Sequence, residues 1–87
     1  MAELHLPTTL KPLFVDLPRR VAVEASTVVE AIEKLDQNWP GMRSRLCEPG
    51  PALRRHIHVY VDQERATLDT PLAKDSRVDV ITAITGG

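Results

Sequence analysis

Hydrophobic and polar residues alternate near the start of the chain, and this alternation predicts two strands. Residues 3–6 place Leu4 and Leu6 on one face, and residues 19–25 place two valines on one face. A period of two residues is typical of a strand with one buried face. Prolines between the two segments indicate a turn region, so we expect the strands to form a hairpin.

A helix is predicted after this hairpin. Thr27 followed by Glu30 has the form of a capping box, in which each side chain accepts a hydrogen bond from a free backbone N–H of the other residue. Glu30 and Lys34 lie four residues apart and predict an ion pair on the solvent side, and Pro40-Gly41 ends the helix. The buried stripe at helical spacing consists of Val28, Ile32, Leu35 and Trp39.

The middle of the chain has less regular patterning. Residues 42–55 predict an irregular crossover with one short turn at 42–46. Alternation resumes in residues 56–61 and predicts a strand whose outer face carries His58 and Tyr60. The apolar residues that we expect on its buried face are Ile57, Val59 and Val61.

A final strand at residues 78–81 completes the order strand, strand, helix, strand, short strand, strand. If the first and last strands are central and parallel, one main helix can cover one face of a mixed sheet of four to five strands. The sequence therefore predicts an α+β fold of the β-grasp, ubiquitin-like type. We expect residues 1–85 to form this domain and residues 86–87 to form a diglycine tail.

Composition narrows the classes of function. The 87 residues are 43% hydrophobic and carry a net charge of −1, with basic and acidic residues interspersed. This balance argues against a nucleic-acid or membrane partner, both of which favour a concentrated basic face. The start of the sequence lacks the layout of a signal peptide, and the single cysteine suits a reducing cytoplasm. We therefore expect a cytoplasmic protein that is monomeric when free.

The candidate chemistry lies in the last residues, Ala83-Ile84-Thr85-Gly86-Gly87. Two terminal glycines arise by chance in roughly one chain in two hundred, so their place directly after a predicted buried strand is the stronger signal. Residues without Cβ can thread a narrow channel with few steric limits. A carboxylate is a poor electrophile, and transfer to AMP would activate it toward a sulfur or nitrogen nucleophile.

Several segments carry a family resemblance. They are Leu-Pro-Thr-Thr-Leu-Lys-Pro at residues 6–12, Asn-Trp-Pro-Gly-Met-Arg-Ser-Arg-Leu at 38–46, residues 59–61, 70–72 and 75–80, and the terminal Gly-Gly. On these residues the chain resembles the ThiS/MoaD family of ubiquitin-like sulfur carriers, and within it the CysO-type branch. The likeness covers essentially the whole length. The turn Asp62-Gln63-Glu64 departs from the branch, which commonly has Gly there.

The resemblance implies that partner enzymes, rather than this chain, perform the chemistry. An E1-like adenylating and sulfurtransferase enzyme would activate Gly87 with ATP, and a sulfur donor would convert it to a thiocarboxylate. Gly86 and Thr85 would form the part of the tail that threads into the partner. The sulfur would pass to a biosynthetic enzyme, for example of the cysteine-synthase class. The chain itself would bind no cofactor or metal and would not be an enzyme.

A docking surface is expected on the outer face of the sheet. His58, Tyr60 and Ile81 fall on neighbouring predicted strands and point away from the helix. An apolar cluster with polar edges on a small protein is a plausible contact surface. The competing interpretation is scattered exposed apolar residues, which are ordinary on protein surfaces.

Other candidate residues have simpler interpretations. Cys47 has no evident basic pair to lower the pKa of its thiol, and Glu48 beside it would raise that pKa, so we expect a structural cysteine. Arg54-Arg55 could contact an acidic partner but is more typical of a solvated edge. The chain's three histidines lack a further ligand for a metal site.

Three other functions stay open at this point. The ending Thr-Gly-Gly resembles that of molybdopterin synthase small subunits, whose tail inserts permanently into a catalytic partner. A ubiquitin-like protein modifier would join Gly87 to target lysines. An interaction domain that is never activated would leave the tail unchanged.

Overall fold

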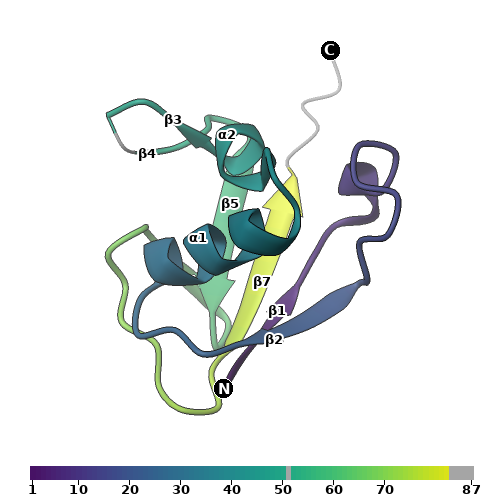
Figure 1. Cartoon of the computed structure of the whole chain (residues 1–87). Coiled ribbons are helices and arrows are strands. Elements are labelled where there is room, and N and C mark those ends of the chain that lie inside the picture. Colours follow the sequence, from purple (N-terminus) through teal and green to yellow (C-terminus); the bar gives the residue numbers. More distant parts are fainter. Residues whose placement is uncertain (51, 83–87) are drawn as a thin grey trace.

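The computed structural model describes residues 1–50 and 52–82, which form a five-stranded sheet crossed by one main helix (Figure 1). The sheet order is β2-β1-β7-β5-β6. The strands are β1 (Ala2–His5), β2 (Arg20–Val23), β5 (Ile57–Val61), β6 (Glu64–Ala66) and β7 (Arg77–Thr82). Their ends differ by one or two residues from the predicted ranges, as is usual for element boundaries.

The sheet is mixed, as predicted. β1 pairs in parallel with β7, and Leu4 lies opposite Val78. The other neighbours, β1–β2, β7–β5 and β5–β6, are antiparallel. The first and last strands therefore lie in the interior of the sheet, which confirms the β-grasp arrangement expected from the order of elements.

Helix α1 (Val28–Asn38) covers one face of the sheet (Figure 1). The predicted stripe is confirmed for three of its residues, because Val28, Ile32 and Leu35 are all buried. Trp39 differs from the prediction: it follows the last helical residue and is only partly buried against the core. Its backbone N–H still donates to the carbonyl of Leu35, at 2.8 Å, and closes the last turn.

The start of α1 confirms half of the predicted capping box. Thr27 Oγ1 accepts from the backbone N–H of Glu30 at 3.3 Å, but the Glu30 carboxylate accepts from the N–H of Ser26, at 2.6 Å, rather than from Thr27. The predicted ion pair between Glu30 and Lys34 is wrong. Lys34 instead donates to the carbonyl of Glu24, because Ser26 already holds the Glu30 carboxylate.

The predicted irregular crossover contains regular structure. Its first part is a short helix, α2 (Met42–Leu46), and β3 (Cys47–Glu48) pairs with β4 (Ala52–Leu53). Asp36 of α1 holds the start of α2, because its Oδ1 accepts from the N–H of Gly41 at 3.1 Å and of Arg43 at 3.0 Å. Glycine suits position 41, whose φ is 100°.

The core lies between α1, α2 and the inner face of the sheet. Ile57, Val59 and Val80 from the sheet join Ile32 and Leu35 in one buried cluster, as the alternation predicted. A 3₁₀ turn, η1 (Thr8–Leu10), contributes Leu10 to the same cluster. Across residues 1–50 and 52–82, neither α-helix has the length and apolar character needed to cross a membrane.

Candidate functional site

Strand β7 leads directly into the tail. Its first half is paired with both β1 and β5, and its last residues, up to Thr82, are paired with β5, so the sheet fixes the direction of the strand. Thr82, its last residue, lies opposite Ile57 of β5, and its Oγ1 is 3.1 Å from Thr9 Oγ1 in η1. The expected tail residues Thr85, Gly86 and Gly87 lie outside the described residues.

A small pocket adjoins the end of β7. Its volume is about 250 Å³, and its lining combines apolar side chains with two basic ones. The lining residues are Thr9, Leu10, Leu13, Arg45, His56, Ile57 and Thr82. Three separate segments, the η1 region, α2 and the start of β5, therefore meet at Thr82, the last residue of β7.

The outer face of the sheet brings together the three residues predicted for docking. His58 of β5 lies opposite Ile81 of β7, and Tyr60 follows on the same face, opposite Asp79. Ile81 is 44% exposed, whereas His58 and Tyr60 are partly buried. The structure thus confirms that the three side chains share a face, with Ile81 as its most exposed apolar residue.

Polar side chains that the sequence analysis did not identify surround these residues. Arg65 Nη2 lies 2.6 Å from His58 Nδ1, and the Arg65 guanidinium carbon is 6.0 Å from the centre of the Tyr60 ring. Arg77 Nε bonds both carboxylate oxygens of Asp79, at 3.1 Å each, beside Ile81. A hairpin register assigned from the turn at residue 62 would have placed Arg65 opposite Tyr60. On the outer face, Ile81 and Tyr60 therefore lie beside charged and polar side chains of β5, β6 and β7.

Cys47 follows α2 directly and is buried. Burial raises the pKa of its thiol, and the positive charges of Arg43 and Arg54 oppose this rise. The raised pKa agrees with the expected structural cysteine, although two arginines do lie near the thiol: Arg43 precedes it in α2, and Arg54 follows Leu53, which pairs with Cys47. Burial is the larger effect, so the thiol is held in its neutral, unreactive form.

The histidines take part in local contacts. His5 Nε2 lies 2.6 Å from Glu3 Oε1 on the same strand, and His56 lines the pocket at the end of β7. Within residues 1–50 and 52–82, no three His, Cys, Asp or Glu side chains are grouped as metal ligands.

Comparisons with known proteins agree with this architecture. The sequence profile of the ThiS family matches residues 12–87. The sulfur carrier protein CysO of Mycobacterium tuberculosis is 28% identical over 90 residues, which span 97% of this chain and 96% of that protein.

Solved structures extend the likeness to the fold. The crystal structure of Mycobacterium tuberculosis CysO superposes with a TM-score of 0.84 at 26% identity, covering 97% of this chain and all of the other. The small archaeal modifier protein 1 of Haloferax volcanii gives 0.74 at 26% identity, over 95% of this chain and 97% of the other. The Amycolatopsis orientalis BexX/CysO complex gives 0.89 at 24% identity, over all of both chains, and shows a shared fold.

The profile match, the near full-length identity and the shared ubiquitin-like fold agree with one another. The chain therefore belongs to the ThiS family, has a ubiquitin-like fold and is similar to the sulfur carrier protein CysO.

Proposed function

We propose that this chain carries sulfur as a thiocarboxylate formed on Gly87, the last residue of the sequence. An E1-like enzyme transfers AMP from ATP to the Gly87 carboxylate, and pyrophosphate leaves. A sulfur donor then attacks the carbonyl carbon, so that a C–S bond replaces the C–O bond to AMP. The thiocarboxylate delivers this sulfur to a biosynthetic enzyme, for which we propose one of the cysteine-synthase class.

The observation that carries this proposal is the position of the tail at the end of an interior strand. Hydrogen bonds to β1 and β5 hold β7 on both sides, and the contact between Thr82 and Thr9 ties its last residue to η1. The body can therefore rest against an enzyme while residues 83–87 reach its catalytic site. Thr85 and Gly86 form the threaded part, since glycine accepts the backbone conformations that a narrow channel requires.

The proposal assigns catalysis to the partners. The carrier contributes a carboxylate and a docking surface, and the adenylating enzyme holds ATP. The buried, neutral thiol of Cys47 supports this division, because a thiol in that form is a poor acceptor of sulfur. We further propose that the carrier works in the cytoplasm, where its single cysteine stays reduced.

Deleting Gly87 tests the terminal-thiocarboxylate mechanism. The deletion moves the carboxylate back by about 3.3–3.6 Å in an extended chain, and a 1 Å misplacement of reacting groups can cost about 100-fold in rate. With its E1-like enzyme, ATP and a sulfide source, the wild type should gain the mass difference between one sulfur and one oxygen atom. The shortened chain should gain none.

Two controls accompany this measurement by intact-protein mass spectrometry. Thermal melts of the two chains should coincide, because removing a terminal glycine removes almost no apolar surface. Fragmentation of the wild type should locate the added sulfur on Gly87. Sulfur uptake by the shortened chain, or sulfur located on Cys47, would contradict the mechanism.

A second function is favoured by one comparison. The Haloferax volcanii protein of similar fold, 26% identical, is named a small archaeal modifier protein. An activated Gly87 that meets a lysine amine instead of a sulfur donor would form an isopeptide bond. Digestion of cell lysate with a protease, followed by a search for lysines that carry the C-terminal residues of this chain, would detect such conjugates.

A further inference from the structure

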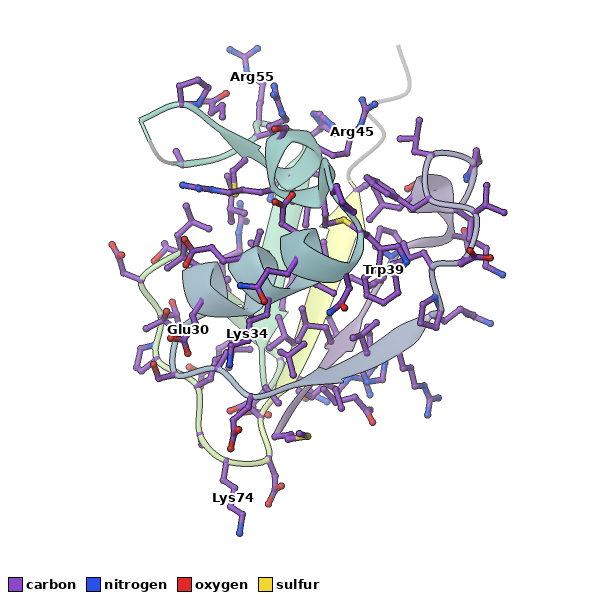
Figure 2. The ribbon with its side chains drawn as sticks, in the orientation of Figure 1. Glu30, Lys34, Trp39, Arg45, Arg55 and Lys74 are labelled. Atoms are coloured by element: carbon purple, nitrogen blue, oxygen red, sulfur yellow. The ribbon has the colours of Figure 1, made fainter. Side chains whose placement is uncertain are left out.

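Basic residues gather at the end of the molecule from which the tail leaves. Between residues 41 and 56 the chain carries four arginines and one acidic residue, Glu48. These residues lie in α2 and in the segment that leads to β5, beside the end of β7 (Figure 1). Figure 2 shows Arg45 and Arg55 at this end of the molecule and Lys74 at the opposite end. The distribution of charge is therefore uneven although the net charge is only −1.

The four arginines differ in what they contact. Arg54 is tied to the body, because its Nε donates to the carbonyl of Ser44 at 2.8 Å. Arg43 and Arg54 border Cys47 in a separate pocket. Arg45 and Arg55 are exposed, and no carboxylate of the described residues lies within ion-pair distance of either. Their charges therefore face solvent.

The segment between β5 and β7 is more acidic, and part of it lies at the opposite end of the molecule. Residues 62–75 contain four carboxylates and two basic side chains. The six residues of β7 separate the two ends by about 20 Å, more than two Debye lengths of about 8 Å at physiological ionic strength. A partner at the tail end is therefore screened from Asp62 and Asp75 near the start of β7, whereas Asp69 lines a pocket with Arg54 and Arg55 and is not distant from them.

An apolar side chain completes the surroundings of the tail. Leu13 is 50% exposed and lines the same pocket as Arg45 and Thr82. Thr82, the last residue of β7, thus shares a pocket with an apolar residue from the η1 region, with Arg45 of α2 and with His56 from the approach to β5. We name Leu13, Arg45 and Arg55 the tail-exit surface.

We infer that the tail-exit surface binds an acidic protein surface around the channel that receives the tail. The inference rests on the proposed function and adds the chemistry of the partner. Two exposed guanidinium groups complement carboxylates of a partner, and such complementarity raises association rates and sets orientation. The overall charge of −1 and the acidic opposite end disfavour nucleic acid, which requires a broader basic face.

Charge reversal tests this inference. Arg45→Glu and Arg55→Glu each change the net charge by the same amount as Lys74→Glu, which serves as the matched control at the opposite end. ATP–pyrophosphate exchange by the adenylating enzyme of the same organism reports activation as a function of carrier concentration. At low salt each arginine variant should lower kcat/KM by about tenfold or more, with kcat at saturating carrier unchanged. Lys74→Glu should stay within about twofold of the wild type.

Salt and nucleotide dependence sharpen the test. Near 1 M salt, where the Debye length is about 3 Å, the arginine variants should approach the wild type. Arginine variants that match Lys74→Glu would overturn the inference. A raised KM for ATP with an unchanged KM for the carrier would also overturn the inference, because it would mean that the arginines interact with the nucleotide rather than with the enzyme surface.

A direct binding measurement distinguishes failure of this inference from failure of the proposed function. Calorimetric titration of the adenylating enzyme with the carrier, without ATP, measures docking alone. If the wild type binds but supports no exchange, the proposed function fails, and weaker binding by Arg45→Glu and Arg55→Glu than by Lys74→Glu still supports the surface. If the wild type exchanges and all three variants bind equally, only the surface is wrong. Absence of any wild-type binding would overturn both.

Discussion

At the scale of single residues, Cys47 shows how burial determines reactivity. Its thiol follows α2, where desolvation raises the pKa more than the guanidinium groups of Arg43 and Arg54 lower it. The thiolate is the reactive form of cysteine. The only sulfur-bearing nucleophile of the chain is therefore kept away from the chemistry proposed for Gly87.

We predict that Cys47 resists alkylation in the folded protein. At pH 8, iodoacetamide should label native Cys47 at least about tenfold more slowly than the urea-unfolded chain, because labelling requires opening of the structure. Mass spectrometry of quenched samples measures both rates. Equal rates would show that the thiol is accessible.

The same residue should make stability depend on pH. A thiol whose pKa is higher in the folded than in the unfolded state contributes stability that is complete below the unfolded pKa of about 8.5. This contribution is lost as the pH rises through the folded pKa. Urea titrations between pH 8 and 10 should therefore show a larger loss of stability for wild type than for Cys47→Ala.

The sequence indicates a turn at Asp62-Gln63, but the residue types do not predict that both residues adopt a left-handed conformation. Asp62 and Gln63 both have positive φ, 49° and 73°, although neither is glycine, the residue that two-residue hairpin turns favour. Asp62 Oδ1 accepts from the N–H of Arg77 at 2.9 Å, and the N–H of Asp62 donates to the Arg77 carbonyl. These contacts with β7 offset the strain, and they join residues that are distant in sequence.

At the scale of elements, α1 stabilises the fold through its buried stripe. Ile32→Ala should lower the free energy of unfolding by about 2–4 kcal/mol, because it leaves a cavity against the sheet. Glu33→Ala changes the adjacent, exposed position and should stay within about 0.5 kcal/mol of wild type. Urea denaturation measures both values. An Ile32→Ala protein as stable as wild type would contradict the packing of α1 on β5 and β7.

The elements differed in how well the sequence predicted them. α1 and β5 are long enough for their apolar periodicity to identify both the element and its buried face, and both were predicted. α2 has five residues, and its start is held by Asp36 of the preceding helix. The paired strands β3 and β4 have two residues each, too short for an alternation. β3 contacts α2, and β3 and β4 pair with each other, so their formation depends on tertiary contacts.

At the scale of the whole molecule, the outer face of the sheet is a second contact surface beside the tail. Ile81→Asp should leave the melting temperature nearly unchanged, because Ile81 is 44% exposed. At carrier concentrations well below saturation, adenylation should fall on the order of tenfold, which corresponds to about 1.4 kcal/mol of binding. ATP–pyrophosphate exchange measures this loss.

A matched control variant shows whether the loss of adenylation depends on the position of the added charge or on the charge alone. Ala22→Asp adds the same charge on an exposed position of β2, at the edge of the same sheet. It should adenylate like the wild type. Equal rates for all three chains would remove Ile81 from the contact surface.

Whether a feature of the whole molecule could be predicted from the sequence depends on the contacts that create it. The interior, parallel position of the first and last strands was predicted from the order of elements, and the shared face of His58, Tyr60 and Ile81 was predicted from alternation. The tail-exit surface was not, because Leu13 and Arg45 meet in one pocket only in the fold, and Arg55 comes from a third segment, directly before His56 of that pocket. The sequence shows Arg54-Arg55 as a basic pair, but only the fold places it beside the end of β7.

The parallel contact between β1 and β7 also determines when the chain can fold. Glu3 lies opposite Arg77, so the interior strand pair joins the beginning of the described chain to its end. During synthesis this pair cannot form until β7 has left the ribosome, and closing so long a loop carries an entropic cost that earlier contacts do not offset. A polypeptide that ends before Arg77 lacks β7, the strand that pairs with both β1 and β5, and it is exposed to proteolysis. Only chains that have been synthesised past β7 can therefore complete the sheet. A chain that stops earlier, and so lacks the C-terminal residues, stays unfolded and is open to proteolysis before any activating enzyme meets it.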